Sequence, residues 1–200
     1  MNNRPSLTTG RDEFTYFPGL VRIPEGAAPD IKNKSYQIKA EVVIPKAGAE
    51  GMLLTHGGRF SGYGFYLLKG KPVFLYNLAG VARYSVAGKE ALKPGKHTIL
   101  FDFNYDGGGI GKGGKGTLQV DGKTVATGRI ERTLAFRLSL DETLDCGEDT
   151  GTPVSEEYRT PFKFTGELTK VTVYLKPVPL TAQDQRKLEN GIAAAALAAQ

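Results

Sequence analysis

The residues best suited to chemistry lie in one acidic stretch, Leu140 to Val154, which reads LDETLDCGEDTGTPV. Five carboxylates fall within nine positions of this stretch, and the only cysteine of the chain lies among them: Asp141, Glu142, Asp145, Cys146, Glu148 and Asp149. No lysine or arginine occurs between Arg137 and Arg159. Residues of these types can ligate a cation, act as a catalytic acid and base, or supply a thiolate nucleophile.

Calcium suits the oxygen ligands of this stretch. Carboxylates and loop carbonyls are the hard ligands that Ca²⁺ prefers, and the neighbouring glycines allow the backbone to wrap tightly, although the spacing is not that of an EF-hand loop. We expect a calcium-binding or domain-contact loop formed by Asp141, Asp145, Glu148 and Asp149. In the alternative interpretation, backbone amides and nearby arginines satisfy the carboxylates without a metal. The arginines in question are Arg129, Arg132 and Arg137.

Catalysis by the same residues lacks its partners in the sequence. A cysteine nucleophile needs a base beside it, and neither His56 nor His97 can be placed next to Cys146 from the sequence. Glycoside hydrolysis needs two carboxylates that flank a substrate cleft. In glucanase-like jelly rolls such a pair lies on one strand at period-two spacing, and this chain has no Glu-x-Asp-x-Glu strand. We therefore predict no catalytic residue.

A glycine-rich run, Asp106–Gly116 (DGGGIGKGGKG), contains two patterns associated with phosphate binding. Gly109-x-Gly111-x-x-Gly114 matches the dinucleotide fingerprint, and Gly109 to Lys115 matches a P-loop except at its last position. Both motifs need a strand before them and a helix after them, because the helix N-terminus holds the phosphate. Strands are predicted on both sides of this run, so we predict a flexible hairpin loop and no phosphate site.

Alternation of apolar and polar residues predicts the scaffold that carries these motifs. Tyr36–Ile44 and His97–Tyr105 alternate with period two, which is typical of half-buried strands. One face of each strand is predicted to be apolar: Tyr36, Ile38, Ala40 and Val42, then Ile99, Phe101, Phe103 and Tyr105. Lys69-Gly70-Lys71 and Asp121-Gly122 have the composition of tight hairpin turns. About eleven strands follow one another with turn signals between them, so we expect an all-β, two-sheet antiparallel jelly-roll sandwich with a C-terminal α-helix.

We expect three segments along the chain: a flexible N-terminal tail at 1–13, a β-sandwich domain at 14–176 and a Pro-linked C-terminal helix at 177–200. Thr181 with Asp184 resembles a capping box at the start of that helix. The residues that follow are good helix formers, but the apolar stripe is thin, so the helix needs a partner surface. The stripe consists of Leu188, Ile192 and Ala196.

Composition narrows the functional classes. The formal net charge is +5, yet the lysines and arginines are scattered, which is typical of a solvated surface and not of a nucleic-acid interface. A single cysteine cannot form an internal disulfide, so no oxidising compartment is indicated. The N-terminal residues lack an apolar signal region and no run approaches transmembrane length. We expect a cytoplasmic chain, as given, with no nucleic-acid partner and no membrane partner.

Four longer phrases resemble one known family. They read GGRFSGYGFYLLKGKPVFLYN, KHTILFDFNYDGGGIGKGGKGTLQVDGKTVATGRIERT, FRLSLDETLDCGEDTGTPVSEEY and PFKFTGELTKVTVYL. They are similar to the C-terminal region of bacterial arylsulfatases of the formylglycine type, over about Tyr16 to Leu175. The resemblance implies a concanavalin A-like, laminin-G-like β-sandwich.

The catalytic part of that family has no counterpart in this chain. Those sulfatases carry their nucleophile in a C/S-x-P-x-R motif of an N-terminal α/β domain, whereas Cys146 is followed by Gly-Glu-Asp. The calcium and sulfate ligands of the family have no matching positions either. The resemblance therefore implies the accessory portion of such an enzyme and gives Cys146 no catalytic role.

Three functions follow from these observations. The leading expectation is a non-catalytic β-sandwich accessory domain of an arylsulfatase-like sulfuric ester hydrolase, whose partner is a sulfatase catalytic domain or its sulfated substrate. The first alternative is a free-standing lectin-like module that binds carbohydrate through Tyr, Phe and polar loop residues. The second alternative is a hydrolase with an unrecognised site.

Overall fold

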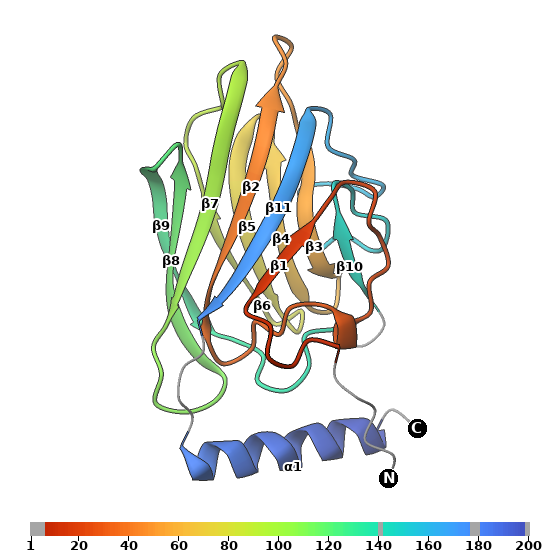
Figure 1. Cartoon of the computed structure of the whole chain (residues 1–200), viewed down its shortest axis with the longest axis vertical. Helices are drawn as coiled ribbons and strands as arrows, with labels where there is room; N and C mark the ends of the chain where they lie inside the picture. The colour runs from red at the N-terminus through yellow and green to blue at the C-terminus, as the bar shows by residue number, and fades with distance from the viewer. Residues whose placement is uncertain (1–6, 140–141, 177–180, 199–200) are drawn as a thin grey trace.

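Two antiparallel sheets packed face to face form the body of the protein, and a helix lies across their lower end (Figure 1). The computed structural model describes residues 7–139, 142–176 and 181–198. The expected all-β, two-sheet sandwich with a C-terminal helix is confirmed. The expected linker at 177–180 and the first six residues of the expected tail lie outside the described residues. Within these ranges, no helix is long and apolar enough to cross a membrane.

The described strands divide into two sheets of unequal size. Sheet A has six strands in the order β1 (Glu13–Tyr16), β11 (Glu167–Lys176), β2 (Ser35–Ile44), β7 (Gly95–Tyr105), β8 (Lys112–Val120) and β9 (Lys123–Arg132). Sheet B has five strands in the order β10 (Leu144–Cys146), β3 (Gly51–Gly57), β4 (Gly62–Leu68), β5 (Lys71–Leu78) and β6 (Ala82–Ala87). A short 3-10 helix spans Glu25–Ala27, and α1 spans Ala182–Ala198.

Alternation along β2 and β7 builds the core between the two sheets. Every second side chain is buried along β2 and along β7 from Ile99 to Tyr105, which confirms the predicted apolar faces. Sheet B supplies the opposite wall, where the Phe74 ring stacks on Phe101 with a centroid distance of 3.6 Å. Each large apolar side chain buried in this way contributes about 1.5–3 kcal/mol. Because the core fixes the inward side chains, it also fixes which polar side chains of sheet A face solvent.

The two predicted hairpin turns are confirmed by their backbone angles. Lys69 and Gly70 have φ values of 50° and 76°, and Asp121 and Gly122 have φ values of 51° and 78°. Two consecutive positive φ values are the mark of a type I′ turn, whose twist matches that of the strands it joins.

The glycine-rich run differs from its prediction. Residues 112–116, which we expected in a flexible loop, form the first half of β8. The reason lies in the register with β7, where Phe103 faces Gly116 and Tyr105 faces Gly114. A Cβ atom at Gly114 would lie 2.5 Å from the Phe103 ring. The glycines therefore make room for the aromatic side chains of the neighbouring strand.

The outer face of sheet B is closed by a segment that we call the covering segment, residues 147–166. It buries a second apolar cluster against β3, β4 and β5: Met52, Tyr66, Val73, Leu75, Val154 and Tyr158. Backbone bonds between Asp149 and Phe162 pin the two ends of the segment together, with N–O distances of 3.4 and 3.1 Å. Among the described residues, no such segment covers β2 on sheet A, and the outward side chains of β2 are half-buried.

Helix α1 contacts the sandwich through a narrow face. Asp184, Leu188 and Gly191 are its half-buried positions among those described. A Cβ atom at Gly191 would lie 2.3 Å from the ring of Phe136, so the glycine allows this contact. Ile192 is 49% exposed, which places it away from the contact. The contact therefore runs through Leu188 and Gly191. Of the stripe predicted at Leu188, Ile192 and Ala196, Leu188 takes part, Ile192 does not, and the side chain of Ala196 lies outside the described set.

Candidate functional site

Asp145 of the acidic stretch joins two distant parts of the chain by hydrogen bonds. This residue lies in β10 and is buried. Its Oδ1 accepts a hydrogen bond from the Arg22 backbone N–H at 2.7 Å, and its Oδ2 accepts two from Thr150, from the backbone N–H at 2.9 Å and from Oγ1 at 2.6 Å. These three hydrogen bonds satisfy both oxygens of a buried polar group that would otherwise be costly to bury. Asp145 thus ties the covering segment to the N-terminal part of the chain.

Asp149 belongs to the covering segment, and its buried side chain is also hydrogen-bonded. Its carboxylate accepts hydrogen bonds from the Tyr158 hydroxyl and from the Gly151 N–H. Burial raises the pKa of Asp149 to about 6, because the charged form loses its hydration, and these two hydrogen bonds only partly oppose the change. The nearby carboxyl groups of Asp145 and Glu142 raise this pKa further.

The remaining acidic residues of the stretch do not converge on one point. Glu142 accepts hydrogen bonds from the backbone N–H and hydroxyl of Thr152 at 3.1 and 2.7 Å. Glu148 is half-buried, and Asp141 lies outside the described residues. In the described part of the chain, no three His, Cys, Asp or Glu side chains are grouped to hold a metal ion. Calcium binding stays a prediction, and calorimetric titration of Ca²⁺ into wild type and Glu148→Ala tests it.

Cys146 lies in the core, and no base is hydrogen-bonded to it within the described part of the chain. It is fully buried, and burial, with a smaller effect of Asp145, raises the pKa of its thiol to about 12. The thiol is therefore protonated at neutral pH. His56 lies nearby on β3, opposite Leu144, but neither of its ring nitrogens has a hydrogen-bond partner among the described residues. The arrangement lacks the paired base that a cysteine nucleophile requires.

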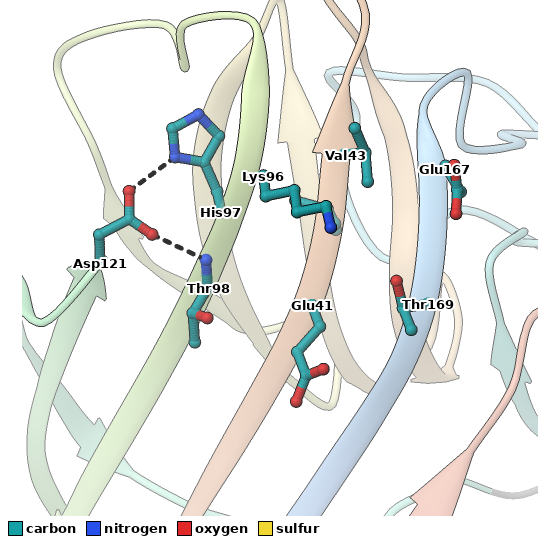
Figure 2. Close-up of a pocket in the computed structure, with 9 residues that line it drawn as sticks. Glu41, Val43, Lys96, His97, Thr98, Asp121, Glu167 and Thr169 are labelled. Carbon is teal, nitrogen blue, oxygen red and sulfur yellow. Dashed lines mark hydrogen bonds and ion pairs between the residues drawn. The ribbon is translucent and has the colours of Figure 1, made fainter.

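A different set of residues lines a hollow on the open outer face of sheet A (Figure 2). The hollow has a volume of about 380 Å³ and lies where β2 ends and where β7 and β11 begin. Strand register brings the lining together, since Val43 pairs with Lys96 on one side and with Glu167 on the other. Glu41 pairs with Thr98 one level further along. Paired residues of antiparallel strands point to the same face, so these side chains meet.

The lining combines several kinds of hydrogen-bonding group with an apolar centre. The Lys96 ammonium group and the hydroxyl groups of Thr98 and Thr169 can donate hydrogen bonds, and the Glu167 carboxylate can accept them. The carboxylate of Glu41 lies between two lysines, 3.4 Å from Lys39 and 3.5 Å from Lys170. The hydroxyls can also accept, so a polar ligand would find both kinds of partner in this hollow.

Asp121 and His97 form the corner of the hollow nearest β8 (Figure 2). Asp121 Oδ1 accepts a hydrogen bond from the Thr98 N–H at 2.8 Å, and Oδ2 lies 2.7 Å from His97 Nδ1. The Thr98 hydrogen bond and the neighbouring His97 lower the pKa of this carboxyl group. Asp121 is therefore ionised at neutral pH and fastens the β8–β9 turn to β7.

Sequence reasoning did not identify any residue of this hollow as a site residue. The outward positions of β2, β7 and β11 are visible as the polar half of each alternating pattern. Their proximity depends on the pairing of strands that are far apart in sequence, such as Val43 and Glu167. The alternation predicts that each side chain faces solvent, but it does not contain the register that brings them together.

Comparison with known proteins supports the fold and leaves the family open. No protein-family model matches the chain, and no curated protein matches it. The carbohydrate-binding module CBM40 of the Ruminococcus gnavus IT-sialidase, solved with α2,6-sialyllactose, is similar over 89% of this chain and 97% of its own, with 14% identity and a TM-score of 0.53. A second structure of the same module is similar over 92% of this chain and 97% of its own, with 14% identity and a TM-score of 0.53.

A toxin domain has the same architecture. The binding domain of botulinum neurotoxin serotype D is similar over 90% of this chain and 43% of its own, with 10% identity and a TM-score of 0.50. At these identities the likeness shows the fold alone. The sandwich of this chain is thus of a kind found in sugar-binding modules and toxin binding domains.

The expected relationship to arylsulfatases is wrong. The structural neighbours described above are carbohydrate-binding modules and toxin binding domains, and no family model or curated protein links the chain to a sulfatase. The leading expectation, an accessory domain that packs on a sulfatase catalytic domain, is corrected on the same ground. The phrases that carried the resemblance form strands and turns of the sandwich and contain the buried carboxylates of Asp145 and Asp149.

Proposed function

We propose that this protein is a carbohydrate-binding module that holds an oligosaccharide in the hollow of sheet A. The observation that carries the proposal is the lining itself, in which donors and acceptors surround Val43 on an open sheet face. The fold shared with a module solved with sialyllactose supports the same class of ligand. The covering segment closes sheet B, so sheet A offers the accessible face.

The lining matches the chemistry of sugars. A pyranose ring presents hydroxyl groups that donate and accept hydrogen bonds around its edge, and a patch of C–H groups on its face. Lys96 can donate to ring or hydroxyl oxygens, Glu167 can accept from two neighbouring hydroxyls, and Val43 can pack against the C–H patch. All three residues stand on strands, so their backbone positions are fixed before a ligand binds, although the exposed side chains of Lys96 and Glu167 must still be ordered.

A binding assay with matched variants tests the proposal. The wild-type protein is screened on an array of neutral and acidic oligosaccharides that includes sialyllactose, and the best ligand is measured by calorimetry. Lys96→Ala removes a donor of the hollow, and Glu167→Gln removes the charge and replaces one acceptor oxygen by an NH2 donor. We expect each to weaken binding about 10- to 100-fold, since a hydrogen bond to a charged group contributes about 1.5–3 kcal/mol.

Lys115→Ala is the control for Lys96→Ala. Lys115 is exposed on the same face of sheet A, opposite Asn104 at the far end of β7. It lies about 27 Å from Lys96 along the strand, at roughly 3.4 Å per residue. We expect it to bind as wild type does. Absence of binding to every sugar, or equal losses for the two lysine variants, would contradict the proposal, and cleavage of the bound sugar, followed by chromatography, would favour a hydrolase.

A further inference from the structure

A second hollow lies beside the sheet A hollow, and we call it the edge hollow. It has a volume of about 400 Å³. Its lining comes from three parts of the chain that are far apart in sequence: Pro18 and Gly19, Gly147 and Glu148, and residues between Lys163 and Leu168. Glu167 belongs to the linings of both hollows. Because the two hollows share this side chain, one ligand can reach into both.

The edge hollow exists because β1 is shorter than its partner strand. β1 pairs with β11 only at residues 171–174 of β11 (Figure 1). Among the described strands, none lies beside residues 167–170 of β11 on this side of sheet A. Beyond Tyr16 the chain turns toward β10, where the Gly19 N–H donates a hydrogen bond to the Cys146 carbonyl oxygen at 3.1 Å. The hollow therefore lies where a longer β1 would continue.

Backbone hydrogen bonds hold the walls of the edge hollow in place. The Phe164 N–H donates to the Gly147 carbonyl oxygen at 3.0 Å, which adds to the bonds between the two ends of the covering segment. In this antiparallel pairing Glu148 lies opposite Lys163, and both side chains line the hollow. The charged groups of the hollow thus stand on a fixed backbone, as those of the sheet A hollow do.

Four charged side chains of the two hollows are available to a ligand. They make no ion pair with any described residue: Lys96, Glu148, Lys163 and Glu167. Glu41, by contrast, is already held between two lysines. The four available groups are two ammonium groups and two carboxylates, so their charges balance. Sugar hydroxyls can accept hydrogen bonds from the ammonium groups and donate to the carboxylates, whereas an acidic sugar would add a charge that nothing here balances.

We propose that a neutral oligosaccharide of at least two sugar residues lies across β11 and fills both hollows. This inference rests on the proposed function and extends it to a class of ligand. Lys96 on β7 and Glu167 on β11 are two strand spacings apart, each of about 4.8 Å, and the edge hollow extends beyond β11. That span is longer than one pyranose ring. Glu167 accepts hydrogen bonds from two neighbouring sugar residues, and Lys163 donates to the residue in the edge hollow.

The length of sugar that the protein recognises tests this inference. Calorimetry compares four neutral trisaccharides, cellotriose, xylotriose, mannotriose and N-acetylchitotriose, with the methyl glycosides of their single sugars and with α2,3- and α2,6-sialyllactose. We expect the best neutral trisaccharide to bind about 10- to 100-fold more tightly than its methyl glycoside, which is the effect of one further hydrogen bond to a charged group. Both sialyllactoses should bind more weakly than this trisaccharide.

Variants locate the added affinity in the edge hollow. Lys163→Ala should remove most of the advantage of the trisaccharide over the methyl glycoside, because the longer ligand loses its donor there. Lys163→Arg keeps a positive donor and should preserve the advantage. Lys115→Ala is again the control and should bind as wild type does. Lys163 and Lys115 are both exposed, so we expect the urea unfolding midpoint of each variant to equal that of wild type.

NMR locates the ligand on the wild-type protein. The amide signal of Thr98 reports on the sheet A hollow, and the amide signals of Gly19 and Gly166 report on the edge hollow. Titration with the best trisaccharide should shift all three signals together.

The outcomes separate this inference from the proposed function. If the trisaccharide and its methyl glycoside bind equally well, and Lys96→Ala weakens both, the inference is overturned and the proposed function stands. Unshifted Gly19 and Gly166 signals, or an undiminished advantage in Lys163→Ala, overturn the inference in the same way. Tighter binding of either sialyllactose overturns the assignment of a neutral ligand. A protein that binds none of these sugars rejects the proposed function and the inference together.

Discussion

The imidazole of His56 lies inside the sandwich, and neither of its nitrogens is hydrogen-bonded to a described residue. Burial lowers its pKa to about 4, because a charged ring would lose its hydration there. In the unfolded chain a histidine has a pKa near 6.5, so the unfolded state binds more protons between these two values. The stability that depends on His56 is fully present above about pH 6.5 and is lost as the pH falls toward 4 and below.

Replacing His56 by leucine should remove this loss. The difference of roughly 2.5 pKa units corresponds to ~3 kcal/mol of unfolding free energy between about pH 6.5 and 4. Leucine also removes two buried nitrogens without partners, so the variant should be no less stable than wild type at neutral pH. Urea unfolding across this pH range measures the effect. Parallel curves for the two proteins would contradict the role assigned to His56.

Asp149 changes the stability of the protein with pH in the direction opposite to His56. Its pKa is raised from 3.8 to about 6, so the folded state binds more protons than the unfolded state between those values. Stability associated with this residue is therefore highest at low pH and is lost as the pH rises through about 6. Asp149→Asn keeps an acceptor for the Tyr158 hydroxyl and carries no charge. It should gain ~2–3 kcal/mol relative to wild type at pH 7 and little at pH 4.

Thermal or urea unfolding of Asp149→Asn at both pH values measures that gain. Glu148→Gln is the matched control, because it neutralises the adjacent, half-buried carboxylate of the same segment. A gain of equal size in both variants would show that overall charge, and not the burial of Asp149, sets the pH dependence.

At the scale of elements, β8 shows which secondary structure can be predicted from local sequence patterns and which cannot. The alternating strands and the two type I′ turns were predictable, because each signal lies within a few neighbouring residues. Gly113, Gly114 and Gly116 resemble a loop in isolation, since glycine has low strand propensity. They belong to a strand because neighbouring strands occupy the space where side chains would be: Phe103 beside Gly114, Phe101 beside Gly116, and backbone atoms of β9 beside Gly113. The reason that these glycines form a strand therefore lies in the neighbouring strands and not in the local sequence of β8.

Gly114→Ala should therefore destabilise the protein. Its Cβ would lie 2.4 Å from the Asn104 carbonyl oxygen and 2.5 Å from the Phe103 ring, and the backbone atom cannot easily move. We expect a loss of about 1–3 kcal/mol, the range seen when a packed core is overfilled. Gly26→Ala is the control, because open space surrounds that position and the change should be close to neutral. Equal unfolding midpoints for the two variants in urea would contradict this account.

At the scale of the whole molecule, the sandwich was predictable and its site was not. The sandwich follows from many local alternations that agree with one another. The acidic stretch was expected to form a site because five carboxylates are close in sequence, but Asp145 and Asp149 point inward and fasten the covering segment. The hollow combines ordinary surface residues from three strands, and only the register of sheet A makes Lys96 and Glu167 neighbours of Val43.

His56 and Asp149 together set part of the pH dependence of the stability of the whole protein. Between about pH 4 and 6, acidification costs stability through His56 and restores it through Asp149. The net dependence on pH in this window should be smaller than that of either single variant, because the two effects oppose each other.

The pairing of the first and last strands has a practical consequence. Glu13 at the start of β1 lies opposite Tyr174 near the end of β11, so the chain enters and leaves the sandwich at one place (Figure 1). The hollow lies at the other end of β11, beside Glu167, about 23 Å from Tyr174 at roughly 3.3 Å per residue. A dye or a solid support attached beside Glu13 and Tyr174 would leave the hollow accessible to ligands. For the same reason, the sandwich is suited to insertion into a surface loop of another protein.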